Sequence, residues 1–111
     1  MEEKELLTNL ELELRRGTLV LSVLSQLAQP RYGYSLVQGL ESKRVSIDPN
    51  TLYPLLRRLE KQGLLYSEWE TGGPKPRKYY RRTLLGDGIY AELKRQWRLM
   101  AAGMEELLKE E

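Results

Sequence analysis

The stretch DPNTLYPLLRRLEKQGLL, residues 48–65, decides which fold the chain is expected to adopt. Its leucines recur at the three- and four-residue spacing of one helix face, and they are Leu52, Leu55, Leu56 and Leu59. Asp48 is a good N-cap and Pro49 a good first helical residue. Gln62 and Gly63 supply a typical helix end. We therefore predict an amphipathic helix from Pro49 to Gln62.

The polar side of this helix is basic and contains a proline. Opposite the leucines lie Asn50, Pro54, Arg57 and Lys61, with Arg58 beside them and Tyr53 at the margin. Pro54 removes the backbone bond to the carbonyl of Asn50, which costs about 3 kcal/mol in a regular helix interior. We expect a first turn that is loosened or bent and leaves Tyr53 projecting. The alternative is that the early turn tolerates Pro54 and Tyr53 packs on the core.

Composition argues against several classes of function. The 111 residues suffice for one domain. The chain has no Cys, hence no disulfide, and no His, which is the commonest general base and metal ligand. We therefore expect no enzymatic activity, no metal and no cofactor. No apolar run reaches the roughly 18–20 residues of a membrane span and no signal peptide is visible, so a cytoplasmic location is expected.

Positive charge is concentrated in one part of the chain. The net charge is only +2, yet residues 57–82 carry eight basic side chains against three acidic ones. A basic block of this kind, flanked by acidic ends, favours a binding site for a polyanion.

Further helices are predicted on either side of this region. Leucines at helical spacing indicate a helix over residues 2–16, a dense apolar run indicates a buried helix over 18–28, and a shorter helix is expected over 33–43. Residues 45–47 should be extended. Thr83 can cap a last helix that runs to about residue 109.

Two alternating runs predict a β-hairpin. LLYSEWE and RKYYRRT, residues 64–70 and 77–83, flank the turn-like TGGPKP. In the second run the alternation places Arg77, Tyr79 and Arg81 on one side and Lys78, Tyr80 and Arg82 on the other.

The last predicted helix has the apolar spacing of a coiled-coil seam. The seam residues, at spacings of three and four, are Tyr90, Leu93, Trp97, Met100, Met104 and Leu107. We expect them to form the interface of a homodimer. The alternative is a single helix that packs on its own core.

The predicted order of elements is that of a winged helix-turn-helix protein, mainly α with a small β-hairpin wing. Three motifs within it resemble the PadR-like family of bacterial transcriptional regulators: YGY at residues 32–34, TLYPLLRRLEKQGL at 51–64 and KYYR at 78–81. The resemblance implies a DNA-binding repressor that dimerises through its C-terminal helix. Residues 1–83 would then form the winged helix-turn-helix domain with an N-terminal helix, and residues 84–111 the dimerisation helix, in one structural unit.

The chain departs from this family at one position of the wing. Where the family usually has Leu or a similar residue, this chain has Arg82. We therefore expect the side of the strand that bears Lys78, Tyr80 and Arg82 to be wetter, or nearer DNA, than usual.

The predicted DNA contacts follow from a helix inserted in the major groove. Asn50 and Thr51 lie nearest the base edges. The candidates for the phosphate backbone are Arg57, Arg58 and Lys61 on the helix, Lys75, Arg77 and Lys78 on the wing, the hydroxyl of Tyr53, and Tyr32 and Tyr34. Two copies of the helix predict a pseudo-palindromic operator on double-stranded DNA.

A small aromatic effector is a further hypothesis. Some members of the family take flat aromatic ligands against an aromatic residue of the last helix, so Trp97, Met100 and Trp69 are candidate effector residues, with core packing as the alternative. Two other functions remain open. One is a winged-helix module that binds an acidic protein partner without specific DNA recognition, and the other is a small enzyme that uses Glu68 and Glu70.

Overall fold

The predicted amphipathic helix is present in the computed structural model, which describes residues 2–110, as α4, Pro49–Lys61. Its four leucines are buried, and the carboxylate of Asp48 caps it by accepting the N–H of Asn50 at 2.7 Å. Pro54 lies inside the unbroken helix. The expected loosening therefore does not interrupt α4, and because Asn50 is exposed its carbonyl can bond to water instead.

Three helices precede α4: α1, Glu3–Arg16, α2, Leu19–Ser25, and α3, Gly33–Glu41. The predicted positions of all three are confirmed, but α2 ends three residues before the predicted residue 28. Tight turn bonds close it there, from the N–H of Gln26 to the carbonyl of Val23 and from Leu27 to Leu24. Leu27 is nevertheless buried, so the apolar density of this segment reflects burial more than helix length.

The predicted hairpin belongs to a three-stranded sheet. Strands β2, Leu65–Glu70, and β3, Arg77–Arg82, pair antiparallel, and a short strand β1, Arg31–Tyr32, pairs with the other edge of β3. Sequence reasoning missed β1, because two residues are too few to show an alternation. This strand connects the start of α3 to the wing.

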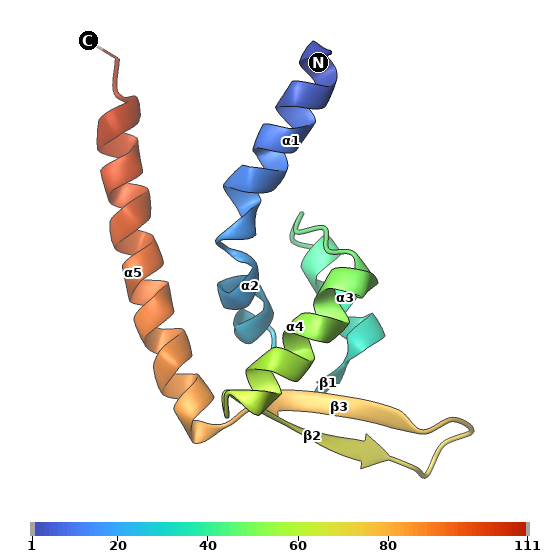
Figure 1. The fold of residues 1–111 in the computed structure, drawn as a ribbon. Helices are drawn as coiled ribbons and strands as arrows, with labels where there is room; N and C mark the ends of the chain where they lie inside the picture. Colours follow the sequence, from blue (N-terminus) through green and yellow to red (C-terminus); the bar gives the residue numbers. More distant parts are fainter. Residues whose placement is uncertain (1, 111) are drawn as a thin grey trace.

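The last helix, α5, spans Leu84–Leu108, and the hydroxyl of Thr83 caps it by accepting the N–H of Gly86. Gly86 is buried against the backbone of Leu64, where a Cβ would overlap the carbonyl oxygen. In Figure 1, α5 and α1 project to the same side of the molecule, away from the hairpin. The whole measures 60 × 35 × 23 Å.

The core is built mainly from leucine, as expected for a chain without Phe. It gathers residues of α2, α3, α4, the sheet and two connecting segments: Val23, Leu24, Leu27, Leu36, Leu40, Ile47, Leu52, Leu55, Leu56, Leu59, Leu65 and Tyr80. Among residues 2–110, no helix is both long and apolar enough to cross a membrane.

One expectation about the wing is wrong. The side of β3 that bears Lys78, Tyr80 and Arg82 faces the helical body and not solvent. Tyr80 is only 4% exposed, and the Arg82 side chain only 12%. The two-residue alternation was right, but it could not show which side the helices cover.

Candidate nucleic-acid interface

The polar side of α4 is uncovered and basic. Its side chains are exposed along the length of the helix: Asn50, Thr51, Tyr53, Pro54, Arg57, Arg58 and Lys61. None of the cations Arg57, Arg58 and Lys61 takes part in an ion pair within residues 2–110. Because the opposite side carries four buried leucines, the helix is anchored in the core with its positive charges facing outward.

Tyr53 links the start of α4 to the start of α3. Its ring lies against Gly33, the first residue of α3, where any Cβ would overlap the ring and its hydroxyl. Gly33 is buried, whereas Tyr53 remains 41% exposed. Each of the two expectations for Tyr53 therefore holds in part, because one side of the ring is packed and the other faces solvent at the margin of the polar side of α4.

The two tyrosines that flank Gly33 have different surroundings. The half-buried ring of Tyr32 meets Tyr79 of β3 edge-on, with 5.6 Å between ring centroids, and the guanidinium of Arg77 lies 4.7 Å from the centroid of Tyr32. Tyr34, in contrast, is exposed at the first turn of α3. In the YGY motif, Tyr32 thus packs against the wing, Gly33 contacts the ring of Tyr53, and Tyr34 faces solvent.

The predicted wing cations divide into two groups. Lys75, in the loop between β2 and β3, and Arg77 are exposed. Lys78 is held on the α4 side of the sheet, where its ammonium lies 3.6 Å from a carboxylate oxygen of Glu60 and 5.3 Å from the ring centroid of Tyr80. Glu60 also accepts a hydrogen bond from Ser67. Lys78 therefore has its charge offset inside the protein.

Sequence reasoning left Arg81 out of the predicted contacts. Arg81 is exposed and shares the outer side of β3 with Arg77, and its guanidinium lies 5.0 Å from the ring centroid of Tyr66. The alternation along β3 had already placed Arg81 on the same side as Arg77.

The predicted seam on α5 divides into two halves. Tyr90 and Leu93 are partly buried and pack against the chain's own core. The remaining seam residues are exposed: Trp97, Met100, Met104 and Leu107. The first half of the seam thus packs on the core of the same chain, and the second half is exposed.

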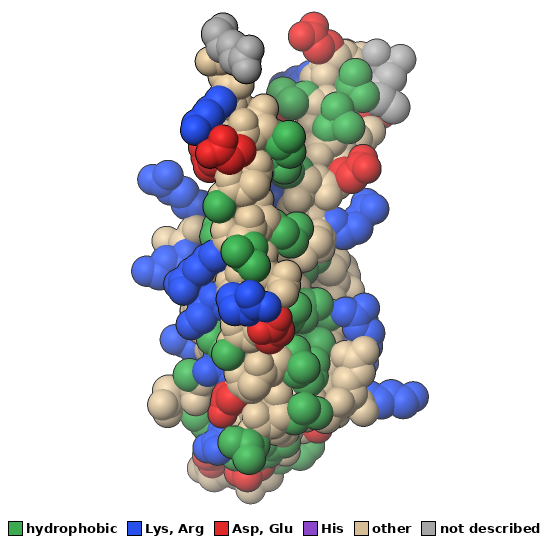
Figure 2. Space-filling model, turned by 90° about the vertical axis from the view of Figure 1, so that its left-hand side faces the viewer, with side chains coloured by type: hydrophobic (Ala, Val, Ile, Leu, Met, Phe, Trp, Pro, Cys, Tyr) green, Lys and Arg blue, Asp and Glu red, His purple; other side chains and the backbone are tan. Residues whose placement is uncertain are grey.

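Helix α1 has no buried residue at all. Its five leucines are 47–77% exposed: Leu6, Leu7, Leu10, Leu12 and Leu14. Figure 2 shows hydrophobic side chains along both projecting helices. Sequence reasoning found the helical spacing of Leu7, Leu10 and Leu14 but did not include them in an interface, because periodicity shows only that a helix has an apolar face and not what covers it.

A groove of about 420 Å³ lies between α2 and α5. Tyr90, Lys94, Trp97 and Arg98 line its α5 side, and hydroxyls such as that of Ser22 line the other. Of the predicted effector residues only Trp97 lines this groove. Met100 lies outside it, and Trp69 is 63% exposed on β2 opposite Lys78. The structure therefore does not bring Trp69 together with Trp97.

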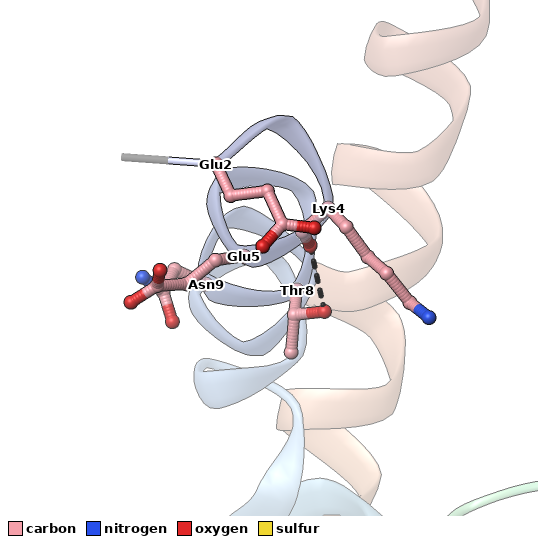
Figure 3. Close-up of a pocket in the computed structure, with 5 residues that line it drawn as sticks. All are labelled: Glu2, Lys4, Glu5, Thr8 and Asn9. Carbon is pink, nitrogen blue, oxygen red and sulfur yellow. Dashed lines mark hydrogen bonds between the residues drawn. The ribbon is translucent and has the colours of Figure 1, made fainter.

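Two other surface features lack the character of a site. A hollow of about 270 Å³ lies at the N-terminal end of α1, and Figure 3 shows the five side chains that line it: Glu2, Lys4, Glu5, Thr8 and Asn9. On the outer side of α5, Glu92 accepts hydrogen bonds from Arg95 and Gln96, and these bonds lower the pKa of its carboxyl to about 2. Among residues 2–110 no group of His, Cys, Asp and Glu side chains could hold a metal ion.

Along the chain α3 is followed by α4, then by the β2–β3 hairpin and the long helix α5. This order of elements defines a winged helix-turn-helix protein. Residues 20–92 match the Transcriptional regulator PadR-like family, and the chain belongs to that family. The family resemblance found in the three sequence motifs is thereby confirmed. Its members are transcriptional regulators and not enzymes.

Individual relatives agree with this assignment. The chain is 34% identical over 99 residues to Transcriptional regulator Rv3488 of Mycobacterium tuberculosis, covering 88% of this chain and 86% of the relative. It is 52% identical to a PadR family transcriptional regulator from Eggerthella lenta, with a TM-score of 0.90 and coverage of 97% and 96%. A transcriptional regulator from Clostridium thermocellum is 30% identical, with a TM-score of 0.80 and coverage of 87% and 99%.

Proposed function

We propose that this transcriptional regulator is a repressor that binds double-stranded DNA sequence-specifically, as a homodimer, at a pseudo-palindromic operator. In each protomer α4 enters the major groove, with Asn50 and Thr51 toward the base edges. The cations Arg57, Arg58 and Lys61 face the phosphates, and the exposed wing cations Lys75 and Arg77 reach the adjacent minor groove.

The observation that carries this proposal is the uncovered polar side of α4. Three of its cations have no acidic partner within residues 2–110, although acidic side chains are almost as numerous as basic ones in this chain. Polar and cationic side chains on one rigid helix, flanked by a basic hairpin, suit a polyanion of regular geometry. Lys78 contributes less than predicted, because Glu60 offsets its charge.

A second copy of the chain supports the dimer, since it would cover two apolar faces at once. The second half of the α5 seam and the leucines of α1 are both exposed, and both lie on the projecting side of the molecule.

Release of the operator by a flat aromatic ligand completes the proposal. The ligand would stack on Trp97 in the groove between α2 and α5, close to Lys94 and Arg98. Titration of the tryptophan fluorescence with a panel of aromatic compounds tests this step, and an unchanged spectrum throughout the panel would count against it.

Selection of bound sequences from a random duplex pool tests the DNA proposal. We expect enrichment of two half-sites related by a two-fold axis. Enrichment of no sequence, combined with an affinity no better than that of other cationic proteins, would favour the alternative of a module for an acidic protein partner.

The salt dependence of binding measures the size of the contact. If the dimer neutralises about 8–10 phosphates, the plot of log affinity against log salt should have a slope of about −7 to −9. A slope shallower than about −3 would contradict this footprint.

A further inference from the structure

Arg82 lies at the elbow where the wing passes into α5. It is the last residue of β3, and its own N–H bonds to the carbonyl of Leu27 at 2.9 Å. Its side chain is enclosed by three contacts. One terminal nitrogen donates to the carbonyl of Leu24 in α2 at 2.6 Å, Nε donates to Asp87 of α5 at 2.8 Å, and the guanidinium lies 4.3 Å from the ring centroid of Tyr90.

These contacts join the body of the protein, which consists of α2, α3, α4 and the sheet, to two successive turns of α5. Leu24 belongs to the C-terminal turn of α2, where carbonyl oxygens carry the negative end of the helix dipole and attract a cation. Asp87 and Tyr90 lie on the first and second turns of α5. The planar guanidinium fixes the directions of its bonds, unlike a leucine, which could fill the same space but would permit α5 to rock.

The contacts also leave Arg82 without a role in reaching DNA. Its guanidinium is turned toward α2 and α5, and its side chain is 12% exposed, so no phosphate can approach it as one can approach Arg77. The role of Arg82 must therefore be sought in the angle between α5 and the body.

We infer that Arg82 is a positioning residue that fixes the angle of α5 to the DNA-binding body and thereby sets which half-site spacing the dimer accepts. This inference rests on the proposed function, because the body is joined to its partner through α5. When the junction between β3 and α5 is rigid in both protomers, the two copies of α4 lie at one fixed separation. The dimer then fits only one spacing between half-sites. One base pair changes that separation by about 3.4 Å and the relative rotation by about 34°.

The test compares half-site spacings with the full-length protein. The operator selected by the unaltered protein is rebuilt with the half-sites one or two base pairs closer or farther apart, and affinities are measured for Arg82→Leu, Arg82→Lys and Asp87→Asn. Arg95→Leu is the matched control, because it removes an exposed arginine of α5 whose partners lie within the same helix.

We expect the unaltered protein and the Arg95→Leu control to lose about tenfold or more in affinity at altered spacings. Arg82→Leu should lose less than about threefold between the same spacings. Arg82→Lys keeps the charge without the planar fork and should resemble Arg82→Leu. A merely structural role would weaken all spacings alike, so an unchanged ratio between spacings in the Arg82 variants would overturn the inference.

A second measurement keeps the inference testable if Arg82→Leu does not fold. Asp87→Asn retains the bond to Leu24, and amide hydrogen exchange in residues 84–94 should be faster in this variant than in the Arg95→Leu control. Equal exchange rates in the two variants would show that the bond between Arg82 and Asp87 does not hold α5. If the unaltered protein selects no duplex at all, the proposed function and the spacing effect both fail, while the exchange result still decides whether Arg82 holds α5.

Discussion

Tyr53 of α4 and Gly33 of α3 are in direct contact, with the tyrosine ring occupying the space that a Cβ of residue 33 would need. The two residues belong to separate sequence motifs, YGY and TLYP, which are about twenty positions apart. Their contact explains why the first motif has glycine at its centre. The contact also fixes the position of the Tyr53 hydroxyl beside the first residue of α3.

The first prediction concerns Gly33→Ala. The added methyl group must displace the Tyr53 ring, so the free energy of unfolding should fall by about 1–3 kcal/mol. Denaturant unfolding measures this loss. In a Tyr53→Ala background the ring is gone and the same substitution should cost almost nothing, so additive effects in this double-mutant cycle would show that the contact is not the cause.

The second prediction separates the ring of Tyr53 from its hydroxyl. Tyr53→Phe keeps the packing on Gly33 and removes only the proposed phosphate donor. The dimer loses two hydrogen bonds of about 1 kcal/mol each, so duplex affinity should fall by about 30-fold. The melting temperature should stay within about 2 °C of the unaltered protein. Undiminished affinity would exclude the hydroxyl from the interface.

The third prediction compares two glycines of α5. By helix propensity alone, Gly86 and Gly88 should each weaken α5 by about 1 kcal/mol relative to Ala. In the structure a Cβ at Gly86 would overlap the carbonyl of Leu64, whereas at Gly88 nothing lies within 4 Å. Gly86→Ala should therefore destabilise the protein by about 2 kcal/mol or more, and Gly88→Ala should stabilise it by up to about 1 kcal/mol. Equal effects on thermal unfolding would argue against the close packing at Gly86.

The fourth prediction compares two lysines of the proposed interface. Lys61 is exposed and has no ion pair within the described residues, whereas Lys78 is paired with Glu60. Lys61→Ala should make the salt slope of duplex binding shallower by about 2, because the dimer loses two phosphate contacts. Lys78→Ala should change the slope by less than about 1. The reverse order would mean that Lys78 leaves Glu60 when DNA binds.

Much of this fold could be predicted because its signals are local. The spacing of the α4 leucines, the Asp48 cap and the alternation along β3 each depend on residues close together in the chain, and each is confirmed. The packing at Gly33 and Gly86 depends on residues that meet only after folding. No local pattern distinguishes a glycine that close packing requires from one that a larger residue could replace.

The same limit explains the errors at the candidate site. Alternation correctly grouped Lys78 with Arg82, yet the helices cover that side of the sheet, so both cations find partners inside the protein. The spacing on α5 predicts the seam, but its division into a covered and an uncovered half depends on which part of α5 packs against the core. Trp69 and Trp97 are chemically alike and lie on different elements, and only the tertiary structure shows that they do not meet.

Helix α1 buries none of its 14 residues in its own protomer. An isolated helix of this length is marginal in water, because nucleation is costly and few bonds repay it. If a second copy of the chain covers α1, as proposed, we expect its helical order to depend on protein concentration by mass action. Far-ultraviolet circular dichroism on serial dilution should lose helical signal before the leucine core melts, so the amount of protein in the cell would itself decide how much of the chain is folded.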